Sequence, residues 1–537
     1  MNLDDARIAL VEALRVEGFS VRPTWCGMDF HGKIKVRGAL VDVILRFDDF
    51  SMMRAPRVIV PTLEQLSRPV VPHLNSFGEL CVYERTSFLF DPYNAAGYSL
   101  GILAKAAEDL ERNIGARAEA EISQELPQHF SEQTIGVSFG QYEGPLIVQA
   151  AAHNNLIIRK IDGYAKADGY AVTTKASLSF RDTEHRPTTW GEFLGWLTSW
   201  DSDASARLVA GLRRCVRRGP DLFAFVCAEN GSIGVRLRLD NIAPAQRQVF
   251  ERIGWTRLLG LGQSRALTVN RMSGRRCDLE YVLSRNGGDM GPLSGKRVML
   301  VGCGSIGGYA SLALAQMGAG AHDGEFVLVD KDILEASNVA RHILGMGEIK
   351  LAKVSACKKL IDTNLPGLKV TPRKSDISAQ LGTLSSFDLV IDATGEHEVG
   401  ELLNRWRLDH FEKDGQPTLL AHGWIEGQGA AVRSFINHAP ENGCYRCLQA
   451  DLLGEQRYRV LKPDADIQPA RPCGEAPYTP YGPAVSMAAA ALLVRHVTEY
   501  VNEGSAKHLL TQQIDHDVTF YVKPASPARI KACPACG

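Results

Sequence analysis

The fold of this chain is decided by the stretch Arg297-Val-Met-Leu-Val-Gly302-Cys-Gly304-Ser-Ile-Gly307-Gly308. Its first residues predict a buried strand, the spaced glycines predict a tight turn, and a helix should follow. Such a turn lets the backbone approach a phosphate closely, and the helix offers its first N–H groups to the same ligand. The motif occurs in many nucleotide-binding proteins, so by itself it indicates a kind of ligand and no particular reaction.

Strands and helices alternate on both sides of this turn. The predicted elements are Arg297–Val301, Ile306–Met317, Glu325–Asp330, Lys350–Asp362 and Asp388–Ala393. This βαβ order predicts a mainly parallel sheet with helices on both faces. We therefore expect an α/β, Rossmann-like domain over residues 291–537.

A group of polar residues follows the second of these strands. Asp330 ends that strand, where an acidic residue can bind ribose hydroxyls. Asn338 and Arg341 lie eight and eleven residues further on, and Lys353 comes twelve residues after Arg341. An NAD site needs no such cations, whereas adenylation does, because negative charge shifts onto the leaving pyrophosphate. The cluster thus favours ATP, the alternative being a pair of solvated surface cations.

These segments resemble the adenylation domain of ubiquitin-activating enzymes and of their bacterial relatives ThiF and MoeB. The segments that match are Gly302–Gly308, Asp330-Lys-Asp332, Asn338-Val-Ala-Arg341, Lys353 and Asp392-Ala-Thr394. The resemblance implies that ATP and Mg²⁺ bind here, with Asp330 on the ribose and Arg341 and Lys353 on the phosphates. It also implies a homodimer, in which Arg285 reaches across the interface.

The chain departs from this family at the expected magnesium ligand. The family carries a second aspartate after the Asp-x-Thr segment, and this chain has Gly395 in its place. Asp392 or Glu396 could substitute for it.

Two Cys-x-x-Cys pairs predict a metal site. Cys444 and Cys447 form one pair, and Cys533 and Cys536 form the other. Each pair places two thiolates on one tight turn, and four thiolates complete the tetrahedral shell of a structural Zn²⁺ ion. Because no position stays open, the ion would tie the C-terminal segment to the adenylation domain.

A further cysteine, Cys473, lies in the proline- and glycine-rich segment Arg471-Pro-Cys473-Gly-Glu-Ala-Pro477. Such a segment predicts an exposed loop, in which a thiol can deprotonate and attack an acyl-adenylate. In activating enzymes of this family, a cysteine of the crossover loop often receives the acyl chain. The alternative is an incidental loop cysteine.

Near the N-terminus, Val71-Pro72-His73-Leu-Asn75-Ser-Phe-Gly78-Glu-Leu-Cys81 resembles the active-site segment of ubiquitin-conjugating enzymes. That family has a His-Pro-Asn triplet before Gly-x-Ile/Leu-Cys, and the glycine, leucine, cysteine and proline match here. His73 stands where the family has the asparagine that steadies the oxyanion, so His73 or Asn75 could take that role. The resemblance implies that Cys81 is a catalytic thiol in an α+β domain; otherwise it is an ordinary buried cysteine.

Length and composition set the outer limits. The chain has 537 residues, of which 45% are hydrophobic and 12 are cysteine, and its formal net charge is −1. At ~100–200 residues per domain we expect three: 1–130 conjugating-like, 131–290 connecting and 291–537 adenylating. The charge excludes a general attraction to nucleic acid or anionic membranes. Acidic residues near the N-terminus and the lack of a long apolar run favour a cytoplasmic protein.

Together the two resemblances imply a bacterial fusion of a conjugating and an activating domain, of the kind found in antiphage CBASS operons. Such a fusion would adenylate the C-terminus of a partner protein, carry it as a thioester on Cys473 and then Cys81, and transfer it to a lysine amine. The implied partner is a cGAS/DncV-like nucleotidyltransferase. The alternatives are a sulfur-carrier adenylyltransferase whose N-terminal domain only binds a partner, an NAD-dependent oxidoreductase, and a scaffold that has lost turnover.

Overall fold

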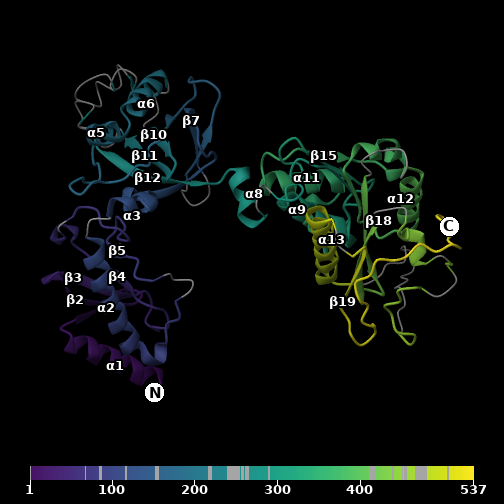
Figure 1. Ribbon diagram of the computed structural model, residues 1–537, viewed down its shortest axis with the longest axis horizontal. Coiled ribbons are helices and arrows are strands. Elements are labelled where there is room, and N and C mark those ends of the chain that lie inside the picture. Colours follow the sequence, from purple (N-terminus) through teal and green to yellow (C-terminus); the bar gives the residue numbers. More distant parts are fainter. Residues whose placement is uncertain are drawn as a thin grey trace. The chain divides into compact units, whose positions relative to one another are not determined.

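A computed structural model describes the chain except for residues 1, 67, 84–87, 115–117, 151–155, 216–220, 239–253, 256–258, 260–264, 266, 288–290, 411–417, 438–440, 450, 453–455, 466–480 and 505–506. The chain divides into two compact units, Met1–Asp278 and Leu279–Gly537 (Figure 1). Within the described part of the chain, no helix combines the length and the apolar character that crossing a membrane requires.

The first unit begins with helix α1 (Leu3–Val16), and the side chain of Asn2 caps it by accepting the Asp5 N–H. An antiparallel sheet of five strands follows in the order β1-β2-β3-β4-β5. Its strands are β1 (Ser20–Pro23), β2 (Met28–Val36), β3 (Ala39–Phe47), β4 (Arg57–Ile59) and β5 (Glu79–Leu80), with short 3₁₀ turns η1 (Leu63–Gln65) and η2 (Pro92–Asn94). One apolar core joins the sheet to the helices α1 and α2 (Ala95–Asn113).

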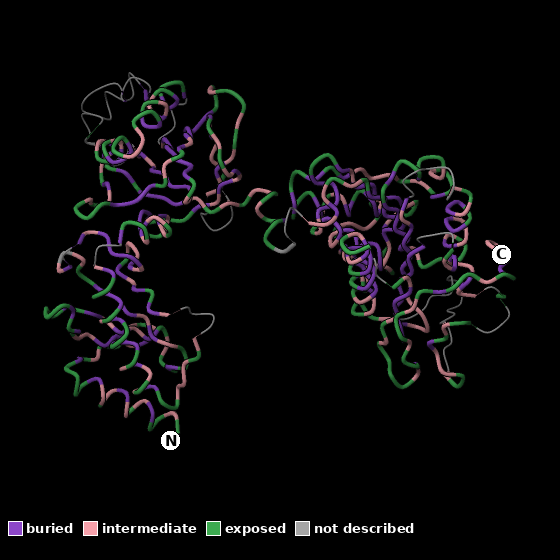
Figure 2. The backbone as a smooth tube through the Cα atoms, in the orientation of Figure 1, coloured by how far each residue is buried: buried purple, intermediate pink, exposed green. Residues whose placement is uncertain are grey.

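A second core of this unit belongs to a closed barrel with the strand order β10-β11-β12-β6-β8-β7-β9. Its strands are β6 (Gln133–Val137), β7 (Gly144–Ala150), β8 (Leu156–Lys160), β9 (Gly169–Thr173), β10 (Asp221–Ala228), β11 (Gly231–Arg238) and β12 (Val269–Arg276). Helices α5 (Trp190–Trp200) and α6 (Ser202–Arg214) cover it. Trp190, Phe193 and Trp196 of α5 are buried there. Many residues of the barrel strands are likewise buried (Figure 2).

Helices α3 (Ala118–Gln124) and α4 (Leu126–Phe130) join the N-terminal sheet to the barrel. Ile122, Leu126 and Phe130 are completely buried and belong to the apolar core of the barrel. Arg271 of β12 adds a hydrogen bond from its Nε to the Phe130 carbonyl, at 2.9 Å. The α3–α4 segment is therefore held by the barrel, although it follows directly on the N-terminal domain.

The second unit contains the predicted α/β domain. Its sheet has the order β15-β14-β13-β16-β17-β18-β19. The first five strands are parallel, and β18 pairs antiparallel with both β17 and β19. The strands are β13 (Arg297–Val301), β14 (Glu325–Val329), β15 (Val370–Arg373), β16 (Leu389–Asp392), β17 (Leu419–Glu426), β18 (Ala431–Asn437) and β19 (Leu509–Gln513). Two apolar cores lie on its opposite faces, so the doubly covered sheet is confirmed.

Two helices of this unit lie close to the predicted segments Ile306–Met317 and Lys350–Asp362, and the limits of its other helices were not predicted. The helices are α8 (Leu279–Gly287), α9 (Ser305–Gln316), α10 (Ala336–Val339), α11 (Lys353–Asn364), α12 (His397–His410) and α13 (Pro483–Glu503), with 3₁₀ segments η6 (Met346–Glu348), η7 (Ile377–Ser386) and η8 (Tyr445–Leu448). Gly318 follows α9 with φ +94°, the left-handed conformation expected just after a helix end.

The buried His496 on α13 makes the stability of this unit depend on pH. Its Nδ1 lies 2.9 Å from Ser434 Oγ and its Nε2 lies 2.6 Å from the Lys507 carbonyl, and burial lowers its pKa to about 4. An unfolded histidine titrates near pH ~6.5, so below that pH the unfolded chain binds a proton that the folded chain does not. We expect the free energy of unfolding to fall by about 2 kcal/mol between pH 7 and pH 5 from this residue.

Urea unfolding at both pH values measures the effect. His496→Gln should lose that part of the pH dependence, whereas His516→Gln, an exposed control, should keep it. Equal pH dependence in the two variants would contradict the prediction.

Candidate functional site

The glycine turn between β13 and α9 has the backbone geometry that its sequence predicts. Gly302 has φ +85°, which favours glycine. A Cβ at Gly307 would lie 1.7 Å from the Gly302 carbonyl oxygen, so no larger residue fits there. Gly304 caps α9. The free N–H groups of the first helical turn therefore stand at the end of β13, where a phosphate can accept hydrogen bonds.

A cavity of about 220 Å³ opens over this turn. It lies at the carboxyl ends of the parallel strands, where ligands bind in open α/β sheets. Six of the predicted binding residues line it: Gly302, Gly304, Asp330, Asn338, Arg341 and Lys353. Residues of separate segments thus meet in one cavity, as the sequence predicts. Gly307 is not a lining residue, but its lack of a side chain allows the close approach to Gly302 within the turn.

Asp330 holds the turn in place. One carboxylate oxygen accepts the Cys303 N–H at 2.7 Å, and the other accepts the Asp332 N–H at 2.8 Å. The carboxylate therefore fixes the turn that carries the phosphate site and stands at the strand end where a ribose would bind.

The two cations that the sequence predicts lie on the rim and wall of the cavity. Lys353 is nearly buried, and its Nζ lies 2.9 Å from Asp332 Oδ2. The guanidinium of Arg341 lies over the Tyr481 ring, 5.6 Å from its centroid. Tyr481 in turn exchanges a 2.8 Å hydrogen bond with Ser305, the first residue of α9. Aromatic and acidic neighbours thus orient both cations beside the phosphate turn.

Asp392, which the sequence suggests as a ligand for nucleotide or metal, faces other protein groups. It is buried; Oδ2 lies 3.0 Å from His422 Nδ1, and Oδ1 accepts hydrogen bonds from the Thr394 N–H and hydroxyl. It is not among the described residues that line the cavity. Glu396 does line it, and among the described residues its carboxylate has no ion pair. The assignment of Glu396 as a metal ligand stays a prediction.

Several residues of the cavity could not be found from the sequence motif. Lys331 and Asp376 form an ion pair of 3.0 Å, and the Ser378 N–H together with Lys331 lowers the pKa of Asp376 to about 2. Burial lowers the pKa of His342, so this imidazole is neutral beside the turn. The position of Asp376 directly after β15, at the same sheet edge, is the one signal that could have indicated it.

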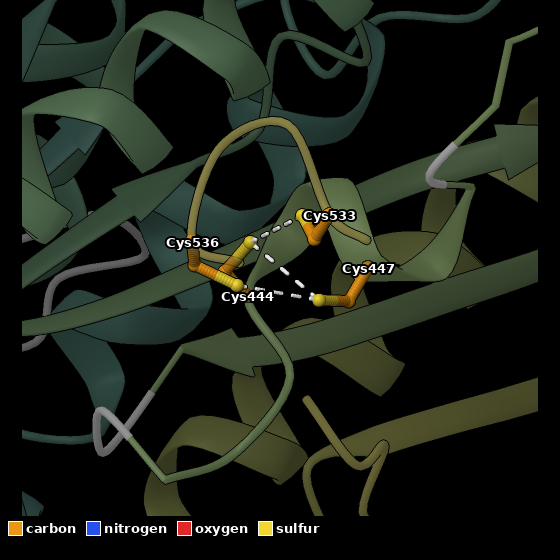
Figure 3. A group of neighbouring side chains, drawn as sticks. All are labelled: Cys444, Cys447, Cys533 and Cys536. Atoms are coloured by element: carbon orange, nitrogen blue, oxygen red, sulfur yellow. Dashed lines mark hydrogen bonds between the residues drawn. The ribbon is translucent and has the colours of Figure 1, made fainter. Parts of the chain in front are cut away.

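The four predicted metal-binding cysteines come together (Figure 3). Their Sγ atoms all lie within 4.8 Å of one another, and neighbouring pairs are 3.5 to 3.9 Å apart. A tetrahedron of ~2.3 Å metal–sulfur bonds has edges of about 3.8 Å, so the sulfur atoms fit such an ion. The Asn404 amide donates to Cys444 Sγ at 3.7 Å, which orients this ligand. The site could thus hold a metal ion.

Cys81 lies in a second cavity, of about 350 Å³, in the first unit. It is exposed directly after β5, so the alternative of an ordinary buried cysteine is wrong. Its N–H donates to the His73 carbonyl at 2.8 Å, and His73 and Asn75 line the same cavity. The loop that resembles the conjugating active site therefore brings its predicted residues to one place.

Glu125 and His129, which the sequence did not indicate, complete this cavity. His73 Nδ1 lies 3.0 Å from Glu125 Oε1, and His129 Nε2 lies 3.5 Å from Glu125 Oε2. The nearby side chain of His129, followed by that of His73, lowers the pKa of Glu125. Both new residues come from the α3–α4 segment, far from Cys81 in the sequence.

Two predicted residues stand apart from these cavities. Cys473 falls within 466–480, outside the described residues, so its role as acyl acceptor stays a prediction. Arg285 of α8 is exposed and lies over Tyr281, 5.9 Å from that ring centroid. Its role across a dimer interface is likewise a prediction.

Comparison with known families agrees with both halves of this arrangement. Residues 285–532 match the ThiF family, and residues 17–134 match prokaryotic E2 family B. The chain is 29% identical to the ATP-dependent ubiquitin transferase-like protein Cap2 of Pseudomonas aeruginosa, over 98% of both chains. It is 30% identical to the protein of the same description from Vibrio cholerae, over 65% of this chain and 61% of the relative.

The class of protein follows from these matches and the two cavities. The chain is a fusion of a ubiquitin-conjugating-like (E2-like) domain and a ThiF-type α/β domain with a four-cysteine cluster. It is an enzyme of the ubiquitin-activating and conjugating kind, and its sites support ATP-dependent activation and conjugation of a protein substrate.

Proposed function

We propose that this enzyme activates the C-terminal carboxylate of a partner protein with ATP and passes it through two thioesters to an amine. The observation that carries the proposal is the meeting of the glycine turn with Arg341 and Lys353 in one cavity, while an exposed thiol occupies the cavity of the E2-like domain. The first arrangement suits adenylation and the second suits acyl transfer.

In the first step, a carboxylate oxygen of the partner attacks the α-phosphorus of ATP and the bond to pyrophosphate breaks. Arg341 and Lys353 offset the charge that grows on pyrophosphate, and the first turn of α9 binds phosphate oxygens through its N–H groups. Asp330 holds the ribose. Glu396 is the cavity carboxylate that suits Mg²⁺, which would neutralise phosphate charge.

In the following steps, the Cys473 thiolate attacks the acyl carbon and AMP leaves. The Cys81 thiolate then attacks the new thioester and releases Cys473, and finally an amine of the acceptor protein displaces Cys81. Together these exchanges replace one difficult acyl transfer by several easier steps. Carrying both domains on one chain raises the effective concentration of the second thiol.

The partner is proposed to be a cGAS/DncV-like nucleotidyltransferase whose conjugation serves antiphage defence, and the acceptor group a lysine amine. The resemblance to fusion proteins of antiphage operons supports this choice. The relatives described as ubiquitin transferase-like support the coarser proposal of transfer to a protein. A cytoplasmic homodimer is proposed on the same ground.

Cys81→Ser tests the proposal and identifies the partner. A serine oxygen accepts the acyl group as an ester, which amines attack far more slowly than a thioester. The variant, recovered from its host cells, should carry a covalent adduct that resists thiol reductants, and mass spectrometry of that adduct names the partner. Absence of any adduct, in cells where the wild type forms conjugates, would contradict the transfer to Cys81.

We further propose that the four cysteines hold a structural Zn²⁺ ion, because four sulfur ligands leave no open position. Cys447→Ser should lower the zinc content from one ion per chain to well below one and the melting temperature of the second unit by roughly 10 °C. Metal analysis and calorimetry check both, with the exposed Cys277→Ser as the control that changes neither. A metal-free wild type with the same melting temperature would contradict it.

A further inference from the structure

Hydrogen bonds hold His73 in a defined orientation beside Cys81. Transfer of an acyl group between two thiols does not by itself need an imidazole in this position. The backbone binds His73 to Cys81 through the 2.8 Å hydrogen bond, and Glu125 holds its ring at 3.0 Å. His73 also has φ +59°, an uncommon conformation for a residue with a side chain. A thiol, an imidazole and a carboxylate in one cavity are the groups with which nucleophilic enzymes move protons.

The carboxylate decides which ring nitrogen of His73 can accept a proton. An ionised carboxylate only accepts hydrogen bonds, so the proton of the neutral ring sits on Nδ1 and the lone pair remains on Nε2. The pKa of Glu125 is lowered, chiefly by the side chain of His129 at 3.5 Å, so this carboxylate stays ionised. Neutral His73 is therefore a proton acceptor at Nε2.

The carboxylate itself stands on a rigid support. Glu125 lies between α3 and α4, whose residues Ile122, Leu126 and Phe130 are completely buried in the core of the barrel. His129 Nδ1 lies 3.1 Å from the Leu74 carbonyl, which ties α4 back to the loop of His73. The barrel, for which the sequence suggested no role, thus supports the group that orients His73.

Asn75, the other residue considered for this loop, is used differently. Its side-chain oxygen accepts the N–H groups of Phe77 and Glu79 at 2.9 and 3.0 Å. This oxygen shapes the turn that leads to β5 and Cys81. Of the two candidates, only His73 has a basic nitrogen, because the amide nitrogen of asparagine is a donor and does not accept a proton.

We propose that His73 is the general base for the attack of the acceptor amine on the Cys81 thioester, and that Glu125 is its positioning residue. The inference rests on the proposed function only in that Cys81 carries the acyl group. The amine nitrogen forms the new bond to the carbonyl carbon, and the carbon–sulfur bond breaks. The sulfur leaves as the Cys81 thiolate, and the proton of the amine goes to His73 Nε2.

The test uses the full chain and needs neither ATP nor the partner. Cys81 is loaded by exchange with a synthetic thioester of a peptide that ends in Gly-Gly, and peptide mapping verifies the position. Free lysine is then added, and the loss of the thioester is followed in a single turnover. Because loading is chemical, failure of the ATP-dependent steps leaves this experiment intact.

Two substitutions remove the base in different ways. His73→Asn tolerates the left-handed backbone and supplies the amide of the conjugating family, and His73→Gln can still donate to Glu125. Both should load normally and react with lysine about 100-fold more slowly than the wild type. Glu125→Gln should react with lysine more slowly than the wild type but faster than either His73 variant, because it keeps the base and loses only the carboxylate that orients it. His31→Gln, on β2 outside the cavity, is the matched control and should react at the wild-type rate.

The pH dependence separates a base from a residue that only shapes the loop. Besides His73 and Glu125, the charged or titratable side chains among the described residues that line this cavity are Arg57, Glu79, Cys81, Tyr83 and His129. The ratio of wild-type to His73→Gln rates cancels the ionisation of lysine. It should shrink as the solution is acidified, because a base can accept the amine proton only while its own nitrogen is unprotonated.

Three results would overturn the proposal. His73→Asn with the wild-type rate would assign His73 to the oxyanion instead. Both variants at the wild-type rate would make it a bystander. A rate ratio that does not change with pH would leave it a structural role only.

Discussion

Replacing Cys81 by alanine is expected to abolish conjugates, with a loss of at least ~10³-fold, because it removes the one thiol among the described residues that line the E2-like cavity. ATP–pyrophosphate exchange that depends on the partner should stay within about twofold of the wild type, since Cys81 and the nucleotide cavity belong to different compact units. Gel analysis of conjugates and isotope exchange measure the two activities on the same preparation.

Cys277→Ala is the matched control, because Cys277 is another exposed cysteine of the first unit and lies outside the Cys81 cavity. It should leave both activities unchanged. Persistent conjugation by Cys81→Ala would favour the alternative of a sulfur-carrier type adenylyltransferase whose N-terminal domain only binds a partner.

The second large effect is expected at the nucleotide cavity. Lys353→Ala and Arg341→Ala should each slow ATP–pyrophosphate exchange by about 10²- to 10³-fold, because each removes a cation from the place where pyrophosphate gains charge. Lys353 is nearly buried and pairs with Asp332, whose carboxylate is half exposed, so water can take over that contact without a large loss of stability.

Lys359→Ala, an exposed lysine on the same helix α11, should leave the exchange rate unchanged. ATP–pyrophosphate exchange requires a protein whose C-terminal carboxylate can be adenylated. The assay therefore uses a free, purified copy of the partner that the Cys81→Ser adduct identifies. If the Lys353 and Arg341 variants exchanged at the wild-type rate, the phosphate role of both residues would be wrong.

Local patterns explain why much of the second unit was predictable. The glycine turn, the βαβ alternation and the two Cys-x-x-Cys pairs each occupy a few consecutive residues, and the chain geometry leaves them few alternatives. Asp330, Arg341 and Lys353 follow at short intervals on the same sheet edge. They meet in one cavity because the carboxyl ends of parallel strands lie together.

The barrel and the Glu125–His73 pair could not be predicted in the same way. Strand β10 is buried along almost its whole length, so its continuous apolar run has no period that distinguishes strand from helix. Glu125 stands 52 residues from His73 in sequence, and the contact depends on the packing of α3 and α4 in the barrel. No local motif carries such information. The contacts of Asp392 could not be predicted for the same reason. Its local motif contains no information on the distant His422, which lies 3.0 Å from its carboxylate.

The central claim, that this enzyme uses ATP to carry a peptide tail on sulfur, can be tested by one measurement on the wild-type chain. The tagged protein is incubated with Mg²⁺ and extract of its host cells, with and without ATP, and the tryptic peptide that contains Cys81 is weighed before and after reduction. The prediction is an added mass on Cys81 that requires ATP and disappears with dithiothreitol. If Cys81 carried no such mass in an extract where conjugates accumulate, transfer through this thiol would be contradicted.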